Sequence, residues 1–295
     1  MEKKRIRFII NPVSGVGKQK NIVADIAKHL DSALFHHEIV FTQKAGHAIG
    51  LAKQAAESNY YAVVSVGGDG SMNEVSCSLI NSNTALAIIP TGSGNGFANH
   101  LGIPHKISEA IKVLNTGRVL DVDTVVANDK TVIGICGVGF DAHIAHEFAN
   151  YGKRGFSSYV KVIMREFPKY KLALYKIEVN GEIIEEKAWL VTVANGSQFG
   201  NNATINPQSI ITDGIMELCI VKPFEWWRFP ILVYALFNNK IDRLPFITTI
   251  KADTITILNN DTTVAHIDGE PVHLGPEILF KVLPKSLKVI VPSNS

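Results

Sequence analysis

The chain has 295 residues, of which 46% are hydrophobic and 19% charged, a balance typical of a globular protein and not of a disordered one. Its formal net charge of +2 argues against a dedicated nucleic-acid-binding protein, which carries a strong basic excess. Three scattered cysteines, Cys77, Cys136 and Cys219, have apolar neighbours, which indicates buried thiols in a reducing cytoplasm and not a disulfide framework or a zinc cluster.

The first part of the chain alternates strand-like and helical patterns. Apolar runs that predict strands occupy residues 6–10, 37–41, 61–66 and 85–89, and helical spacing lies between them at residues 22–30 and, less regularly, 49–56. Continuous valine and isoleucine strands separated by helices predict a parallel sheet covered on both faces. Ligands of such sheets bind at the carboxyl ends of the strands.

The pattern changes after about residue 119, where short strand-like runs are separated by turns through residue 283. The Asn180-Gly181 pair predicts a two-residue hairpin, and helical spacing returns at residues 160–167 and 231–237. We therefore expect an α/β nucleotide-binding domain over residues 1–120, to which residues 284–295 return. A mainly antiparallel β-sandwich is expected over residues 121–283.

The first strand runs into "NPVSGVGKQK", which fails as a Walker phosphate loop. That loop needs glycine and a hydroxyl where this chain has Pro12 and Gln19. Asn11, Ser14 and Gly15 still offer small residues, a hydroxyl and backbone N–H groups where a sheet can receive an anion. An ordinary strand-to-helix turn favours the same residues, so this loop alone leaves both interpretations open.

The third predicted strand runs into "VGGDGSMNEV", in which Gly67, Gly68 and Gly70 permit close backbone approach to a phosphate. A carboxylate at Asp69 would repel that phosphate unless it held Mg²⁺ or took up a proton, so we expect Asp69 to be a chemical residue. The alternative is a plain glycine turn with a surface aspartate.

A third loop of the same kind follows the fourth predicted strand, in "PTGSGNGFA". It offers the hydroxyls of Thr91 and Ser93, the glycine Gly92 and the amide of Asn95. Strand end, small polar loop and helix start thus recur three times in one predicted sheet, which predicts a phosphate-binding site.

The three motifs, in this order and at these spacings, resemble the catalytic domain shared by diacylglycerol kinases, sphingosine kinases and bacterial lipid kinases, and the later "IDGE" fits the same family. NAD kinases and phosphofructokinases also carry GGDG, but Asn73-Glu74 directly after it is the lipid-kinase arrangement. The resemblance implies a three-layer nucleotide domain like theirs, a β-sandwich lipid domain, and ATP in the cleft between them.

Carried over by position, the resemblance and the loop chemistry imply a set of nucleotide-binding residues, with Glu74 supporting the loop or a metal. The set is Asn11, Ser14, Gly15, Thr42, Gly67, Gly68, Asp69, Gly70, Ser71, Met72, Asn73, Glu74, Thr91, Gly92, Ser93 and Asn95.

Two acids in "HIDGE" are candidates for catalysis. A surface hairpin turn explains Asp268 and Glu270 by composition alone. The resemblance implies instead that one of them accepts the proton of the lipid hydroxyl. We favour Glu270 as this base, with Asp268 and Asp69 as metal-binding or orienting carboxylates, although neighbouring acids can exchange these roles.

A structural Mg²⁺ is implied by the resemblance at Asp213 and the carbonyls of Ile210 and Ile215, although turn chemistry also explains Asp213-Gly214. Asp121 occupies another position where the family commonly has an acid. His143 and His146 have helical spacing, but no third ligand follows them, so packed or solvated histidines are favoured over zinc.

Two segments are candidates for contact with a membrane surface. Residues 153–171 carry six basic side chains and one acid along an apolar helical stripe, which a core-facing helix would also explain. The second segment is residues 223–237, which contains the most apolar stretch, residues 226–237. Arg228 and Pro230 interrupt this stretch, and it is too short to span a bilayer. The second segment could dock on lipid or line an acyl-chain pocket.

The main hypothesis is an ATP- and Mg²⁺-dependent lipid kinase, cytoplasmic and peripherally associated with membranes, acting on diacylglycerol, a sphingoid base or a related lipid. Gly96 stands where diacylglycerol kinase relatives usually have aspartate, which weakens that assignment of the lipid. The alternatives are a kinase for a soluble substrate such as NAD, and a non-catalytic nucleotide or lipid sensor. Assembly into a homodimer is left open.

Overall fold

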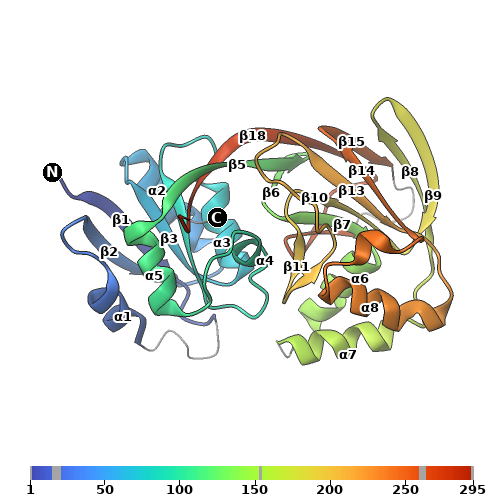
Figure 1. Ribbon diagram of the computed structural model, residues 1–295, viewed down its shortest axis with the longest axis horizontal. Coiled ribbons are helices and arrows are strands. Elements are labelled where there is room, and N and C mark those ends of the chain that lie inside the picture. The colour runs from blue at the N-terminus through green and yellow to red at the C-terminus, as the bar shows by residue number, and fades with distance from the viewer. Residues whose placement is uncertain (1, 15–20, 153–154, 259–263, 294–295) are drawn as a thin grey trace. The chain divides into compact units, whose positions relative to one another are not determined.

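The computed structural model describes residues 2–14, 21–152, 155–258 and 264–293. The chain forms two compact units (Figure 1). The first contains residues 1–122 and 285–295, and the second contains residues 123–284. The boundaries fall inside β5 (Arg118–Ala127) and inside the long β18 (Glu277–Val291).

The first unit contains a parallel sheet with the strand order β2-β1-β3-β4-β18. Its other strands are β1 (Lys4–Ile10), β2 (Phe35–Phe41), β3 (Ala62–Gly67) and β4 (Ala85–Pro90). Every residue of β3 and β4 is buried, as expected for central strands covered on both faces.

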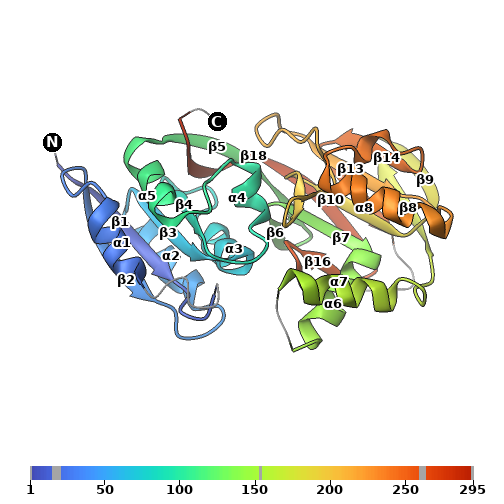
Figure 2. The same ribbon diagram turned by 60° about the horizontal axis from the view of Figure 1, so that its bottom comes forward.

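Helices cover this sheet on both faces (Figures 1 and 2). α1 (Ile22–His29) packs against α5 (Ile107–Thr116), and α2 (His47–Glu57) packs against α3 (Asp69–Cys77). The short α4 (Gly96–His100) follows the third glycine loop. The expected three-layer α/β arrangement is confirmed.

The second unit is a sandwich of two antiparallel sheets whose inner faces share one core. Completely buried side chains reach that core from both sheets, among them Tyr175 and Phe280 from one and Val193 and Leu218 from the other. One sheet pairs the start of β18 with β15 (Thr254–Leu258), β8 (Ala173–Val179) and β9 (Glu182–Ala188). The other has the order β14 (Ile247–Ala252), β13 (Met216–Val221), β10 (Leu190–Ala194), β7 (Ile135–Gly139), β16 (Val264–Ile267) and β17 (Glu270–His273).

Shorter elements complete the second unit. The two later helical patterns are confirmed as α7 (Phe156–Glu166) and α8 (Phe229–Phe237). The remaining short elements are β11 (Gln198–Gly200), β12 (Ala203–Thr204), and the 3₁₀ helices η2 (Trp226–Arg228) and η3 (Ile241–Arg243).

The predicted hairpin at Asn180-Gly181 is confirmed. Val179 pairs with Glu182, so the turn has two residues, and both have positive φ angles of 53° and 78°. Two positive φ angles are the signature of the type I′ turn, which suits the twist of antiparallel strands.

The strand-like run at residues 131–140 is not one continuous strand. β6 (Lys130–Val132) and β7 are separate, and α6 (Phe140–Asn150) follows β7 at once. The strand breaks at Gly134, because the N–H of Gly134 donates to the Asp268 carboxylate and not to a neighbouring strand. A side chain far along the sequence therefore interrupts the ladder.

Candidate active site

The three predicted loops of the first unit meet at the carboxyl ends of β1, β3 and β4. Asn11 donates its backbone N–H to the carbonyl of Val66 at 3.0 Å and its side-chain amide to Ser71 Oγ at 2.9 Å. Ser14 Oγ lies 3.0 Å from Thr91 Oγ1, within hydrogen-bond distance. The first loop is thus bonded to both of the others.

The glycines allow the second and third loops to touch. A Cβ added to Gly92 would lie 2.5 Å from Gly68 Cα, and one added to Gly67 would lie 2.5 Å from Ser71 Cβ. Real Cβ atoms do not approach so closely, so these positions require glycine. Close contact between loops is a second reason for these glycines, beside the phosphate access expected from the sequence.

Asp69 joins the second loop to the third. Its two carboxylate oxygens accept the backbone N–H groups of Asn95 at 2.7 Å and Gly96 at 2.8 Å. Carboxylate oxygens are also ligands that Mg²⁺ favours in proteins. In this structure Asp69 positions the third loop, a role that the sequence did not reveal.

Glu74 and Asn95 support neighbouring backbone. Glu74 accepts the N–H groups of Gly46 at 2.9 Å and Ala48 at 3.3 Å, and so holds the start of α2. The amide of Asn95, whose residue is 3% exposed, donates to the carbonyl of Gly92 at 2.8 Å. Glu74 therefore stabilises the start of α2, and Asn95 stabilises the third loop.

The remaining nucleotide candidates divide by exposure. Thr42 follows β2 and donates its N–H to the carbonyl of Ile10 at 2.9 Å, so it belongs to the same edge of the sheet. Ser93 is exposed, whereas the Met72 side chain is buried. Gly70 and Asn73 are half-buried on α3, and Gly15 lies outside the described residues.

The start of α3 gives this edge its electrostatic character. The helix begins at Asp69, immediately after the carboxyl end of β3 and the glycine pair. The first N–H groups of any α-helix have no intrahelical acceptor, and the helix dipole adds partial positive charge there. The edge can therefore receive a phosphate through backbone groups.

In the second unit, Asp268 is bound to backbone and Glu270 is exposed. The carboxylate of Asp268 accepts N–H groups from Gly134 at 2.7 Å, Ile135 at 2.9 Å and Ile133 at 3.1 Å. Glu270 is the first residue of β17, directly after this turn, and its side chain is exposed. Of the two acids, Glu270 is the one that presents its carboxylate to solvent.

A buried polar cluster that the sequence analysis did not predict lies beside this turn. Asp141 is 7% exposed and accepts hydrogen bonds from Thr192 Oγ1 at 2.8 Å, His266 Nε2 at 3.1 Å and the N–H of Ala142 at 2.9 Å. Burial and then the charge of Asp141 raise the pKa of Tyr170 to about 12. One signal in the sequence was available, since His266 stands two residues before Asp268.

Asp213 lies in a tight turn. Its Oδ1 accepts the N–H of Ile215 at 3.1 Å, and the N–H of Gly214 donates to buried Asp123 at 2.7 Å. Ile210 is exposed. Within the described ranges, no group of three or more histidine, cysteine, aspartate or glutamate side chains is placed to hold a metal. The structural Mg²⁺ therefore stays a prediction that needs backbone carbonyls as ligands.

Buried Glu217 lies near the same turn. Asn206 donates to its Oε2 at 2.7 Å, and Lys251 Nζ lies 3.6 Å from its Oε1. Burial raises the pKa of the Glu217 carboxyl, and the charge of Asp213 acts in the same direction. The carboxylate is therefore less stable here than in water.

Two further candidates form ion pairs or polar contacts. Asp121 accepts a hydrogen bond from Lys288 at 3.0 Å. The ring of His143 lies 3.2 Å from Glu166, which is consistent with a packed histidine.

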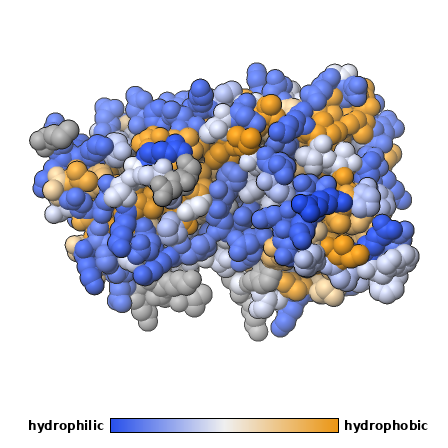
Figure 3. Space-filling view, viewed as in Figure 1, coloured by the Kyte–Doolittle hydropathy of each residue, from blue (hydrophilic) through white to orange (hydrophobic). Residues whose placement is uncertain are grey.

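The α7–α8 side of the second unit exposes aromatic and apolar side chains. Trp226 is 76% exposed and Trp227 58%, and Ile231 and Tyr234 on α8 are exposed beside them. Figure 3 shows hydrophobic side chains gathered over α8, with hydrophilic ones next to them. Among the helices of the described chain, none is long and apolar enough to cross a bilayer.

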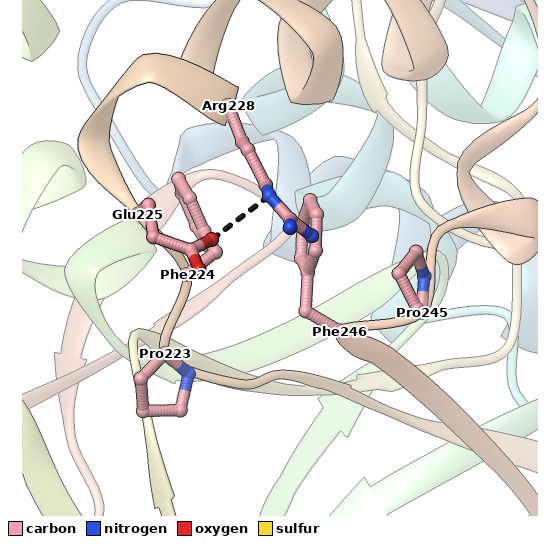
Figure 4. A pocket seen from close by; sticks show the side chains of 6 residues that line it. All are labelled: Pro223, Phe224, Glu225, Arg228, Pro245 and Phe246. Atoms are coloured by element: carbon pink, nitrogen blue, oxygen red, sulfur yellow. Dashed lines mark ion pairs between the residues drawn. The ribbon is translucent and has the colours of Figure 1, made fainter.

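An open pocket of about 420 Å³ is lined in part by residues that flank Trp226 and Trp227 in the sequence (Figure 4). Its rim carries an ion pair in which Arg228 Nε donates to Glu225 at 2.8 Å. The floor belongs to an aromatic stack in which Phe224 lies 4.7 Å from Phe246, centre to centre. The pocket is lined by Pro223, Phe224, Glu225, Arg228, Pro245 and Phe246.

The fold combines an α/β unit, with three small polar loops at one edge of its sheet, and a β-sandwich, and comparison with known proteins gives the family. Residues 5–127 match the diacylglycerol kinase catalytic domain, and residues 134–291, more than half of the chain, match the YegS C-terminal NAD kinase beta sandwich-like domain. The chain therefore belongs to the family of proteins that combine a diacylglycerol kinase catalytic domain with this sandwich domain.

Individual relatives agree with that assignment. The chain is 28% identical to the diacylglycerol kinase of Bacillus subtilis, over 99% of this chain and 97% of the relative. It is 29% identical to the "Probable lipid kinase YegS-like" of Klebsiella pneumoniae, over 86% and 85%. A crystal structure of a diacylglycerol kinase from Bacillus anthracis covers 99% of this chain and 98% of its own, with a TM-score of 0.75 and 23% identity, which shows a shared fold.

Proposed function

We propose that this protein is an ATP- and Mg²⁺-dependent lipid kinase that transfers the γ-phosphate of ATP to a lipid hydroxyl. The observation that carries the proposal is the junction of three small polar loops at the ends of β1, β3 and β4, joined by Asn11, Ser14 and Asp69. The names of the relatives, diacylglycerol kinase and lipid kinase, support the class of acceptor.

The first unit offers hydrogen-bond donors for the phosphate groups of a nucleoside triphosphate. Backbone N–H groups at the start of α3, the small residues Gly67 and Gly68, and the exposed Ser93 suit phosphate oxygens. A magnesium ion that arrives on those phosphates needs only one or two carboxylates from the protein. Asp69 is proposed for this role because its carboxylate lies at the start of α3, in contact with the third loop.

Glu270 is proposed as the general base because it is an exposed carboxylate fixed at the start of a strand. It takes the proton of the lipid hydroxyl as the new oxygen–phosphorus bond forms and the bond to the departing ADP breaks. Bound Mg²⁺ would supply neutralisation of the charge on the phosphates. Asp268 has three backbone partners, so we assign it to holding the turn.

Peripheral membrane association is proposed through η2 and α8. Exposed tryptophan and tyrosine side chains suit the boundary between headgroups and hydrocarbon. Basic side chains outnumber acidic ones by four to two over residues 222–243, which favours anionic lipids. Arg165 on α7 and Arg228 on η2 each pair with a glutamate, Glu147 at 2.7 Å and Glu225 at 2.8 Å, so the charge of both arginines is partly neutralised.

The test of function is transfer of labelled γ-phosphate from ATP to diacylglycerol, sphingoid bases and related lipids in mixed micelles, with NAD and no acceptor in parallel. A labelled lipid supports the proposal and names the acceptor. Labelled NADP would replace it by a soluble-substrate kinase. ATP binding without any labelled product would favour a sensor. Glu270→Gln should abolish transfer and leave ATP affinity within a few-fold of the parent.

Docking is tested by co-sedimentation with phosphatidylcholine vesicles, with and without an anionic lipid. Trp226→Ala combined with Trp227→Ala should weaken binding by roughly 100-fold or more, since each ring loses apolar burial worth about 1.5–3 kcal/mol. Ile183→Ala is the matched control, because Ile183 is 62% exposed on β9 in the same unit. Equal loss in both variants would refute docking through η2 and α8.

A further inference from the structure

The buried cluster around Asp141 is connected to the turn that carries Glu270. His266 lies on β16, and its Nε2 donates to Asp141 at 3.1 Å. Its other ring nitrogen, Nδ1, accepts the N–H of Gly269 at 3.4 Å. Because Asp141 is an acceptor, Nε2 carries the proton and Nδ1 is available to Gly269.

The cluster has a fixed position. A Cβ on Gly137 of β7 would overlap the Asp141 carboxylate and lie 2.8 Å from His266 Nε2. Asp141 and His266 therefore pack directly against the backbone of Gly137. His266 is 2% exposed. β16 is also in register with β7, where His266 pairs with Gly137 and Ile267 with Cys136. The imidazole therefore has little freedom to turn.

We infer that Asp141 and His266 are positioning residues for the Asp268-Gly269-Glu270 turn, with the Asp141 carboxylate orienting the imidazole and the imidazole holding the N–H of Gly269. The inference rests on the proposed function, in which Glu270 is the base. Two anchors then fix this turn. Asp268 binds the backbone before β7, and His266 binds the turn from the other side.

Two substitutions of His266 separate its two bonds. The Gln amide nitrogen reaches the place of Nε2, so His266→Gln keeps the donor to Asp141 and loses the acceptor for Gly269. The Asn carbonyl oxygen occupies the place of Nδ1, so His266→Asn keeps the acceptor and deprives Asp141 of a donor. A buried carboxylate that loses a donor destabilises the fold.

The expected results differ between the two variants. His266→Gln should lower kcat about 10- to 100-fold, with an unchanged KM for ATP and a melting temperature close to the parent, because a shifted base costs rate more than binding. His266→Asn should melt at a lower temperature and lose at most about 3-fold in kcat below its melting range. If His266→Gln keeps its kcat, or if kcat follows melting temperature in both variants, the inference is wrong.

Glu270→Gln and amide hydrogen exchange distinguish failure of this inference from failure of the proposed function. If Glu270→Gln transfers phosphate normally, the assignment of the base fails, whatever His266 does. If the parent protein phosphorylates no acceptor, amide hydrogen exchange in the peptide of residues 264–273 still tests the positioning role of His266. Faster exchange in His266→Gln than in His266→Asn supports the positioning role, and equal exchange overturns it.

Discussion

Replacing Gly92 by alanine tests whether the contact between the second and third loops builds the site. The added Cβ would lie 2.5 Å from Gly68 Cα and 2.9 Å from Asn95 Oδ1. The first of these atoms is backbone, so it cannot rotate away as a flexible side chain would. The loops must therefore separate by roughly 1 Å to reach ordinary contact distances near 3.5 Å.

The cost follows from that displacement. Overpacking of a close contact destabilises a protein by about 1–3 kcal/mol, which lowers the melting temperature by roughly 3 to 10 °C. If both loops contribute to the ATP site, Gly92→Ala should also lower the affinity for ATP at least about 10-fold, which corresponds to about 1.4 kcal/mol. Thermal melting and calorimetric titration with ATP measure the two effects.

Gly50→Ala is the matched control. Gly50 is exposed on α2 of the same unit, and a Cβ there meets nothing within 4 Å. Alanine in a helix interior should leave ATP affinity unchanged and add about 0.5–1 kcal/mol of stability. If Gly92→Ala binds ATP and melts like Gly50→Ala, contact between the loops does not shape the site.

Further substitutions test single contacts. Asp69→Asn keeps one acceptor and turns an NH₂ toward a backbone donor, so it should destabilise the protein by about 1–3 kcal/mol in a melting experiment and lower ATP affinity. Glu217→Gln addresses pH dependence. Because burial raises the pKa of Glu217, its contribution to stability is present below its unfolded pKa and is lost as pH rises through the folded pKa. Melting temperatures of the parent should therefore fall from acid toward neutral pH more than those of Glu217→Gln, and equal slopes would refute this role.

The loops were predictable because topology places them. In a parallel sheet the carboxyl ends of neighbouring strands lie at one edge, so three strand-ending motifs must gather there. The structure adds that Ser14 reaches Thr91 and that Asn11 reaches Ser71. The sequence contained the residue types for these bonds, but which hydroxyl meets which amide depends on backbone positions that spacing does not fix.

The Asp141 cluster was not predictable in the same way. Asp141, Thr192 and His266 come from α6, β10 and β16, and the aspartate and the histidine are 125 positions apart. No local pattern links them, because strand order in the second sheet is not the order of the chain. A lone buried histidine becomes informative only when its neighbours across the sheet are known.

The two aspartates expected to act in chemistry share a structural device. Asp69 accepts two backbone N–H groups of the third loop, and Asp268 accepts three from residues 133–135, where β7 begins. An amide at either position would therefore disrupt backbone placement, and loss of activity there would not by itself show catalysis. Glu270 is exposed, so the amide substitution separates charge from architecture most cleanly at that residue. Activity loss at unchanged melting temperature is the result that would identify Glu270 as the base, and the same loss with lower melting in Asp268→Asn would assign the aspartate to the turn.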